Sequence, residues 1–106
     1  MSRMARHKLK LTVLKRTDPE EYFDEYPVEK EDWFVPCGIY EDDQEIIVEE
    51  SLAMPEGFCQ SAWIAIYPTV RTLGFGGNLP FFKKEGIAVT CCTDGMRPVV
   101  FKIERI

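Results

Sequence analysis

The chain has 106 residues, a length typical of one domain, and 45% of them are hydrophobic, which is enough for a packed core. Its net charge of −5 argues against nucleic acid as a partner, because phosphate binding requires a basic surface. No stretch approaches the roughly 20 apolar residues of a membrane-spanning helix, so no membrane contact is expected.

The N-terminal residues are basic and lack the apolar core of a secretion signal. We therefore expect a flexible basic tail over residues 1–7 and a single domain over residues 8–106. Without such a signal the expected compartment is the reducing cytoplasm. There the four cysteines are expected to be thiols or metal ligands rather than disulfides.

The first half of the chain predicts two strands and a short helix. Apolar and polar residues alternate over residues 8–15, which indicates a half-buried strand. A short helix is predicted over residues 17–26, because Thr17 or Asp18 can cap it and proline suits its first turn. Residues 28–44 are predicted to form a loop, and residues 45–49 form the second predicted strand.

A long helix is predicted to begin around Pro55 to Phe58. Its apolar residues recur every three or four positions and define one face: Cys59, Ala62, Trp63, Ile66, Val70 and Leu73. Pro68 lies inside this run and is expected to kink the helix or to split it near Tyr67. Gly74 is predicted to end the helix as a left-handed cap.

The C-terminal part predicts two more strands, over residues 87–92 and 99–106. Between them, Asp94-Gly95 is the strongest short hairpin signal in the chain. The expected fold class is therefore α+β. It comprises a small antiparallel or mixed sheet of about four strands, with one long kinked helix packed on a face and one short helix.

The cysteines carry the main chemical hypothesis. Cys59 is expected in the first turn of the long helix, where free backbone N–H groups and the helix dipole favour a thiolate. Cys91 and Cys92 are neighbours in a strand and should point to opposite faces, but the pattern does not decide which one faces the helix. Cys37 lies in a Pro-Cys-Gly turn that can present a ligand.

Three thiolates, from Cys37, Cys59 and Cys91, could hold zinc or an iron–sulfur cluster. The spacing contains no Cys-x-x-Cys pair, which excludes a zinc ribbon or a ferredoxin run. Burial as inert core thiols and redox or nucleophilic chemistry are the alternatives. The single histidine, His7, lies in the tail, so a Cys–His dyad is not expected.

Two charged residues beside the strand cysteines are secondary candidates, together with Cys92. Asp94 and Arg97 flank the predicted hairpin turn and could assist a reaction there. The alternative interpretation is that Asp94 shapes the turn and Arg97 is solvated. The sequence assigns no catalytic residue.

Three blocks of the sequence are distinctive. They are residues 54–63, which contain Gly-Phe-Cys followed by Ala-Trp, residues 73–78, and residues 91–103, which contain Cys-Cys-Thr-Asp-Gly and Arg-Pro-Val. Together with the opening strand and the Pro-Cys turn, they resemble a family of short prokaryotic proteins that is frequent in anaerobes. No function is established for that family, so the resemblance implies no activity. Members often carry glycine where this chain has Asp43.

The resemblance places Cys37, Cys59 and Cys91 within the recurring blocks of that family. An anaerobic setting favours an oxygen-sensitive cluster or a low-potential thiol. The leading hypothesis is therefore a cysteine-centred protein that binds a metal or acts in thiol redox chemistry. The alternative is an accessory module with inert cysteines, which forms a homo-oligomer or docks on a larger enzyme.

Overall fold

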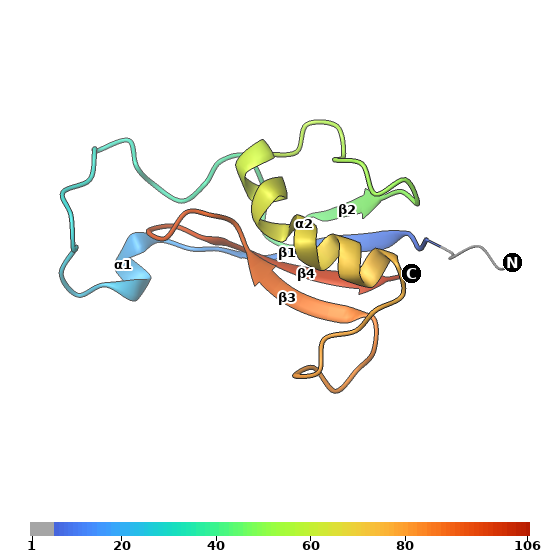
Figure 1. The fold of residues 1–106 in the computed structure, drawn as a ribbon. Coiled ribbons are helices and arrows are strands. Elements are labelled where there is room, and N and C mark those ends of the chain that lie inside the picture. The colour runs from blue at the N-terminus through green and yellow to red at the C-terminus, as the bar shows by residue number, and fades with distance from the viewer. Residues whose placement is uncertain (1–5) are drawn as a thin grey trace, which may run out of the picture.

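The computed structural model describes residues 6–106 and contains one antiparallel sheet crossed by a long helix (Figure 1). The strands lie in the order β2-β1-β4-β3. The elements, in chain order, are β1 (Leu9–Arg16), α1 (Pro19–Tyr22), β2 (Glu45–Val48), α2 (Gln60–Gly74), β3 (Ile87–Cys91) and β4 (Val99–Arg105). The predicted α+β class, with about four strands, one long helix and one short helix, is confirmed.

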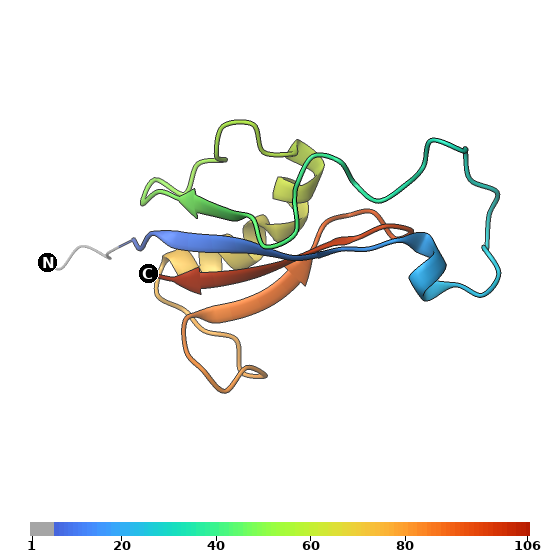
Figure 2. The same cartoon turned by 180° about the vertical axis from the view of Figure 1, so that it is seen from behind.

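Helix α2 covers only one face of the sheet, as the two opposite views show (Figures 1 and 2). The residues of the two central strands that face it are fully or almost fully buried: Leu9, Leu11, Val13, Val99, Phe101 and Ile103. On the other face Lys10 lies between two carboxylates, 3.1 Å from Glu45 and 3.6 Å from Glu104. Alternation with period two thus separates an apolar core face from a charged outer face.

Helix α2 packs on the sheet through the apolar face that its spacing predicted. Ala62, Ile66, Val70 and Leu73 are its buried residues, apart from a glycine at its end. The helix continues through Pro68 without being split, and this residue is exposed. Thr72 donates a hydrogen bond to the carbonyl of Pro68 at 3.0 Å within the same turn.

Both ends of α2 differ from the sequence-based expectation. The helix begins at Gln60, later than predicted, because Gly57 has a positive φ of 78° and a turn precedes the helix. Gly74 is the last helical residue rather than a left-handed cap. A Cβ atom there would lie 2.6 Å from the side chain of Leu52, so any larger residue would force Leu52 to shift.

The predicted loop before β2 is confirmed and carries a turn of unusual backbone geometry. Asp43 has a φ of 65°, the left-handed region that glycine adopts readily and that aspartate tolerates better than most residues. Its N–H donates to the carbonyl of Val13 at 2.7 Å, which ties the turn to the sheet. The turn therefore forms although this residue is aspartate and not glycine.

The predicted tail over residues 1–7 falls mostly outside the described residues, since residues 1–5 are not described. The two that are described contact the end of α2. The N–H of His7 donates to the carbonyl of Gly74 at 2.8 Å, and the guanidinium of Arg6 lies 5.6 Å from the ring centre of Phe75.

Phe101 is the largest fully buried side chain, and it lies beside the rings of Tyr40 and Phe58. We expect Phe101→Ala to lower the free energy of unfolding by about 3–5 kcal/mol, through lost transfer energy and the cavity left behind. Urea unfolding measures this loss. The matched variant Phe81→Ala removes a ring that is 73% exposed and should change stability by less than about 0.5 kcal/mol. Equal losses in the two variants would contradict this account of the core.

Candidate functional site

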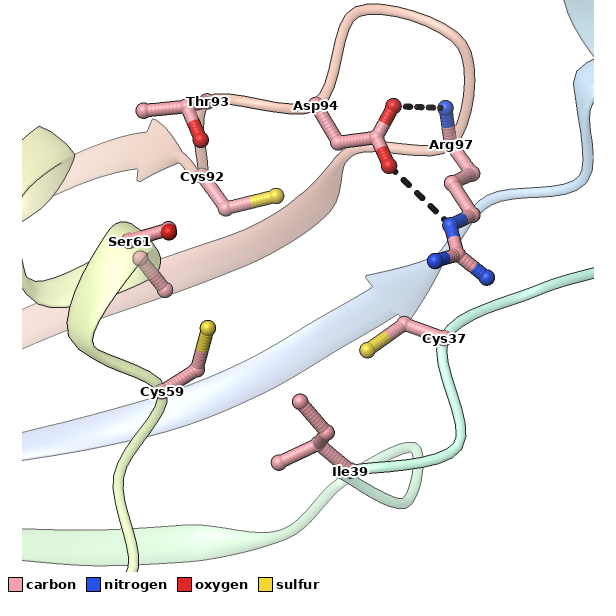
Figure 3. A pocket seen from close by; sticks show the side chains of 9 residues that line it. Cys37, Ile39, Cys59, Ser61, Cys92, Thr93, Asp94 and Arg97 are labelled. Carbon is pink, nitrogen blue, oxygen red and sulfur yellow. Dashed lines mark hydrogen bonds and ion pairs between the residues drawn. The ribbon is translucent and has the colours of Figure 1, made fainter. Parts of the chain in front are cut away.

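Three of the four cysteines line one cavity of about 310 Å³ (Figure 3). The cavity lies between the loop that precedes β2, the start of α2 and the connection between β3 and β4. Its lining residues are Cys37, Ile39, Cys59, Ser61, Ala62, Cys92, Thr93, Asp94 and Arg97. Segments that are far apart in the sequence therefore bring three thiols to one place.

Cys59 is the N-cap residue of α2, with extended backbone angles and no hydrogen bond from its side chain to the first turn. Its thiol is therefore free to face the cavity, as Figure 3 shows. The backbone N–H of Cys59 donates to the hydroxyl of Tyr40 at 3.0 Å. This contact fixes the start of the helix against the segment that carries Cys37.

The structure places Cys92, and not Cys91, in the cavity. Cys91 pairs with Val100 at the end of β3 and is exposed, outside the cavity lining. Cys92 is half-buried against the core, and its sulfur accepts a hydrogen bond from the N–H of Val99 at 3.3 Å. The predicted trio of Cys37, Cys59 and Cys91 is thus not brought together, whereas the secondary candidate Cys92 joins the other two.

Cys37 is positioned by two arginines that bind the backbone of its loop. Arg16 donates to the carbonyl of Cys37 at 3.2 Å. Arg97 donates to the carbonyl of Val35 at 2.6 Å, and its guanidinium stacks 4.1 Å from the ring centre of Phe34. The cavity wall formed by this loop therefore depends on contacts with β1 and with the β3–β4 connection.

Asp94 and Arg97 form an ion pair on the cavity wall. One carboxylate oxygen of Asp94 accepts from the backbone N–H groups of Met96 and Arg97, at 3.0 and 3.2 Å. The other oxygen lies 3.0 Å from Nε of Arg97. Asp94 thus shapes a connection of seven residues, 92–98, in place of a two-residue hairpin.

Tyr40 contacts Cys59 through its hydroxyl and was not a candidate from the sequence, because it falls in a segment predicted only as loop. It is 4% exposed, and burial raises the pKa of its phenol to about 12. The N–H of Cys59 opposes this rise in pKa, while negative charge on Cys59, Cys37 or Cys92 would add to it. The phenol of Tyr40 therefore stays protonated at neutral pH.

All four cysteines are free, and within residues 6–106 no group of three potential ligands is close enough to hold a metal ion as placed. No helix in the described part is long and apolar enough to cross a membrane. No protein family, curated protein or solved structure matches this chain. The resemblance to the prokaryotic family therefore depends on the sequence blocks alone.

The raised pKa of Tyr40 predicts a stability change at alkaline pH. In the unfolded chain this phenol ionises near pH 10, whereas in the folded protein it stays protonated up to about pH 12. Its stabilising contribution is therefore complete below pH 10 and is lost as the pH rises toward 12. Urea unfolding across this range should show a smaller decline in Tyr40→Phe than in the wild type.

The same variant loses the acceptor for the N–H of Cys59, so we expect it to be about 1 kcal/mol less stable at neutral pH. Tyr22→Phe is the matched control, because Tyr22 is 53% exposed. It should leave both the neutral stability and the alkaline decline unchanged. Identical alkaline declines in the wild type and Tyr40→Phe would refute the assignment to Tyr40.

Proposed function

We propose that this domain binds an iron–sulfur cluster through Cys37, Cys59 and Cys92. The observation that carries the proposal is the convergence of three free thiols, from three separate segments, on one cavity (Figure 3). Cysteine thiolates are the ligands that iron–sulfur clusters use. A reducing cytoplasm, as expected from the sequence, would keep such thiols available.

The contacts around the cavity suit an anionic cluster. The N–H of Val99 donates to the sulfur of Cys92, and hydrogen bonds of this kind to sulfur tune the potential of clusters. Cys59 is the N-cap of a 15-residue helix, and the positive end of a helix dipole favours an anionic ligand such as a cluster. Arg97 lies on the same cavity wall, where Asp94 balances its charge.

The size of the cavity favours a cluster over a single ion. Around one zinc ion the ligand sulfurs must lie within roughly 4 Å of each other, because each is about 2.3 Å from the metal. No group of ligands in residues 6–106 meets the requirement for a single ion. A 4Fe–4S cluster binds each thiolate on a different iron atom, which spreads the ligands apart. The cavity of about 310 Å³ has room for it.

Anaerobic reconstitution of the reduced protein with ferrous iron and sulfide tests the proposal. We expect bound iron and sulfide together with a visible absorption band in the wild type. Loss of an outer partner of a metal site typically lowers metal affinity by about 10–100-fold. Cys92→Ser removes a direct ligand, so it should lower the affinity for the cluster by more than that. Cys59→Ser should do the same without unfolding the protein, because serine is a good N-cap residue.

Cys91→Ser is the matched control, since it removes a neighbouring thiol that is exposed and lies outside the cavity. It should retain the iron content of the wild type. Stoichiometric zinc binding with no cluster would contradict the proposal in favour of a single ion. A reversible disulfide among the three cysteines, without metal, would favour thiol redox chemistry. Protein that takes up no iron or zinc and whose thiols do not react would favour the accessory module with inert cysteines.

A further inference from the structure

One wall of the cavity is formed by Arg97, whose side chain is only 23% exposed. Its Nε pairs with Asp94, its Nη1 donates to the carbonyl of Val35, and its plane stacks on Phe34. These contacts hold the guanidinium in a fixed orientation. Figure 3 shows its terminal nitrogens on the side of the cavity that carries Cys37.

The fixed guanidinium still has N–H donors without a partner. Among residues 6–106, Nη2 has no hydrogen-bond or ion-pair partner, although Nε and Nη1 each have one. Two hydroxyl groups, of Ser61 and Thr93, line the same cavity. A partly buried cationic group with unused donors, beside an apolar cavity, is a typical feature of a ligand pocket.

We infer that this wall binds the carboxylate group of a small-molecule ligand, with Arg97 as the residue that recognises it. The planar guanidinium matches carboxylates in bidentate geometry. Ile39 and Ala62 provide apolar contact for the rest of the ligand. A volume of about 310 Å³ lies at the lower end of the roughly 300–1,000 Å³ found for ligand pockets, so the ligand is small.

The inference goes beyond the proposed cluster and does not require it, because the wall is complete in the protein alone. It also bears on the cluster. The cavity holds three cysteines, one fewer than the four thiolates of common clusters. In the proposed cluster, a carboxylate ligand on Arg97 would lie in the same cavity as an iron that lacks a protein thiolate.

Titration of reduced, chelator-treated protein with succinate, followed by ¹⁵N NMR, tests the inference without any metal. We expect saturable shifts in the backbone signals of residues 92–97 and of the segment around Cys37. Arg97→Gln should weaken the binding of succinate at least about tenfold, the scale of losing a charge-assisted hydrogen bond. Inorganic phosphate, titrated in parallel, should bind more weakly than succinate.

Asp94→Asn separates recognition from a merely structural role. Asparagine retains an oxygen that can accept from the N–H groups of Met96 and Arg97, so the turn is kept. It removes the charge that neutralises Arg97, so succinate should bind several-fold more tightly. Arg71→Gln is the matched control, because Arg71 lies in the last turn of α2, stacks on Phe75 and does not line the cavity. It should bind succinate as the wild type does.

Equal succinate affinity in the wild type and Arg97→Gln would overturn the inference. Weaker binding in Asp94→Asn would also count against it, as would a preference for phosphate. Since no metal is present in this titration, its failure leaves the cluster proposal standing. Conversely, failure of the reconstitution leaves the carboxylate site standing.

Discussion

The packing of Phe101 against two other aromatic rings determines where the cavity lies. Its ring centre is 5.4 Å from that of Tyr40 and 5.7 Å from that of Phe58, so a central strand contacts a loop and the turn before α2 at one point. Tyr40 then accepts the N–H of Cys59, the residue at which the helix begins. The apolar core thus sets the positions of two cavity walls, and the hydrophobic energy of burying these rings stabilises the site.

The third wall depends on polar contacts in place of apolar burial. The loop that carries Cys37 has few buried side chains, and Arg16 and Arg97 hold it through its backbone carbonyls. Figure 2 shows this loop continuing into an extended segment that projects beyond the sheet toward α1. Such a wall can move more easily than the other two, because few apolar contacts oppose its opening.

Local patterns in the sequence predicted the strands, the helical face and the fold class. They failed at the ends of α2, because the left-handed Gly57 delays its start and the approach of Leu52 to Gly74 is a tertiary contact. The position of Cys37 was also beyond local patterns. It depends on Arg97, which lies 62 positions along the chain from its partner Val35. Tyr40 was missed for the same reason.

The sequence did contain a signal for the choice between the two strand cysteines. In β4, charged Lys102 and Glu104 alternate with apolar residues, which marks the side of the sheet that faces solvent. Thr90 pairs with Phe101 on the core side, and Cys92, two positions later, shares that side. Cys91 falls on the other side. When the alternation of β4 is continued into β3 through the observed pairing, it places Cys92 on the core side.

Because side chains in β3 alternate between the two faces of the sheet, the length of the strand decides which cysteine faces the cavity. One residue inserted or deleted between Ala88 and Cys92 would exchange the faces of the two adjacent cysteines, although the composition of the strand would hardly change. The exposed thiol would then face the core and the cavity thiol would face solvent. The length of this short segment therefore constrains the chain more tightly than the identity of most of its side chains.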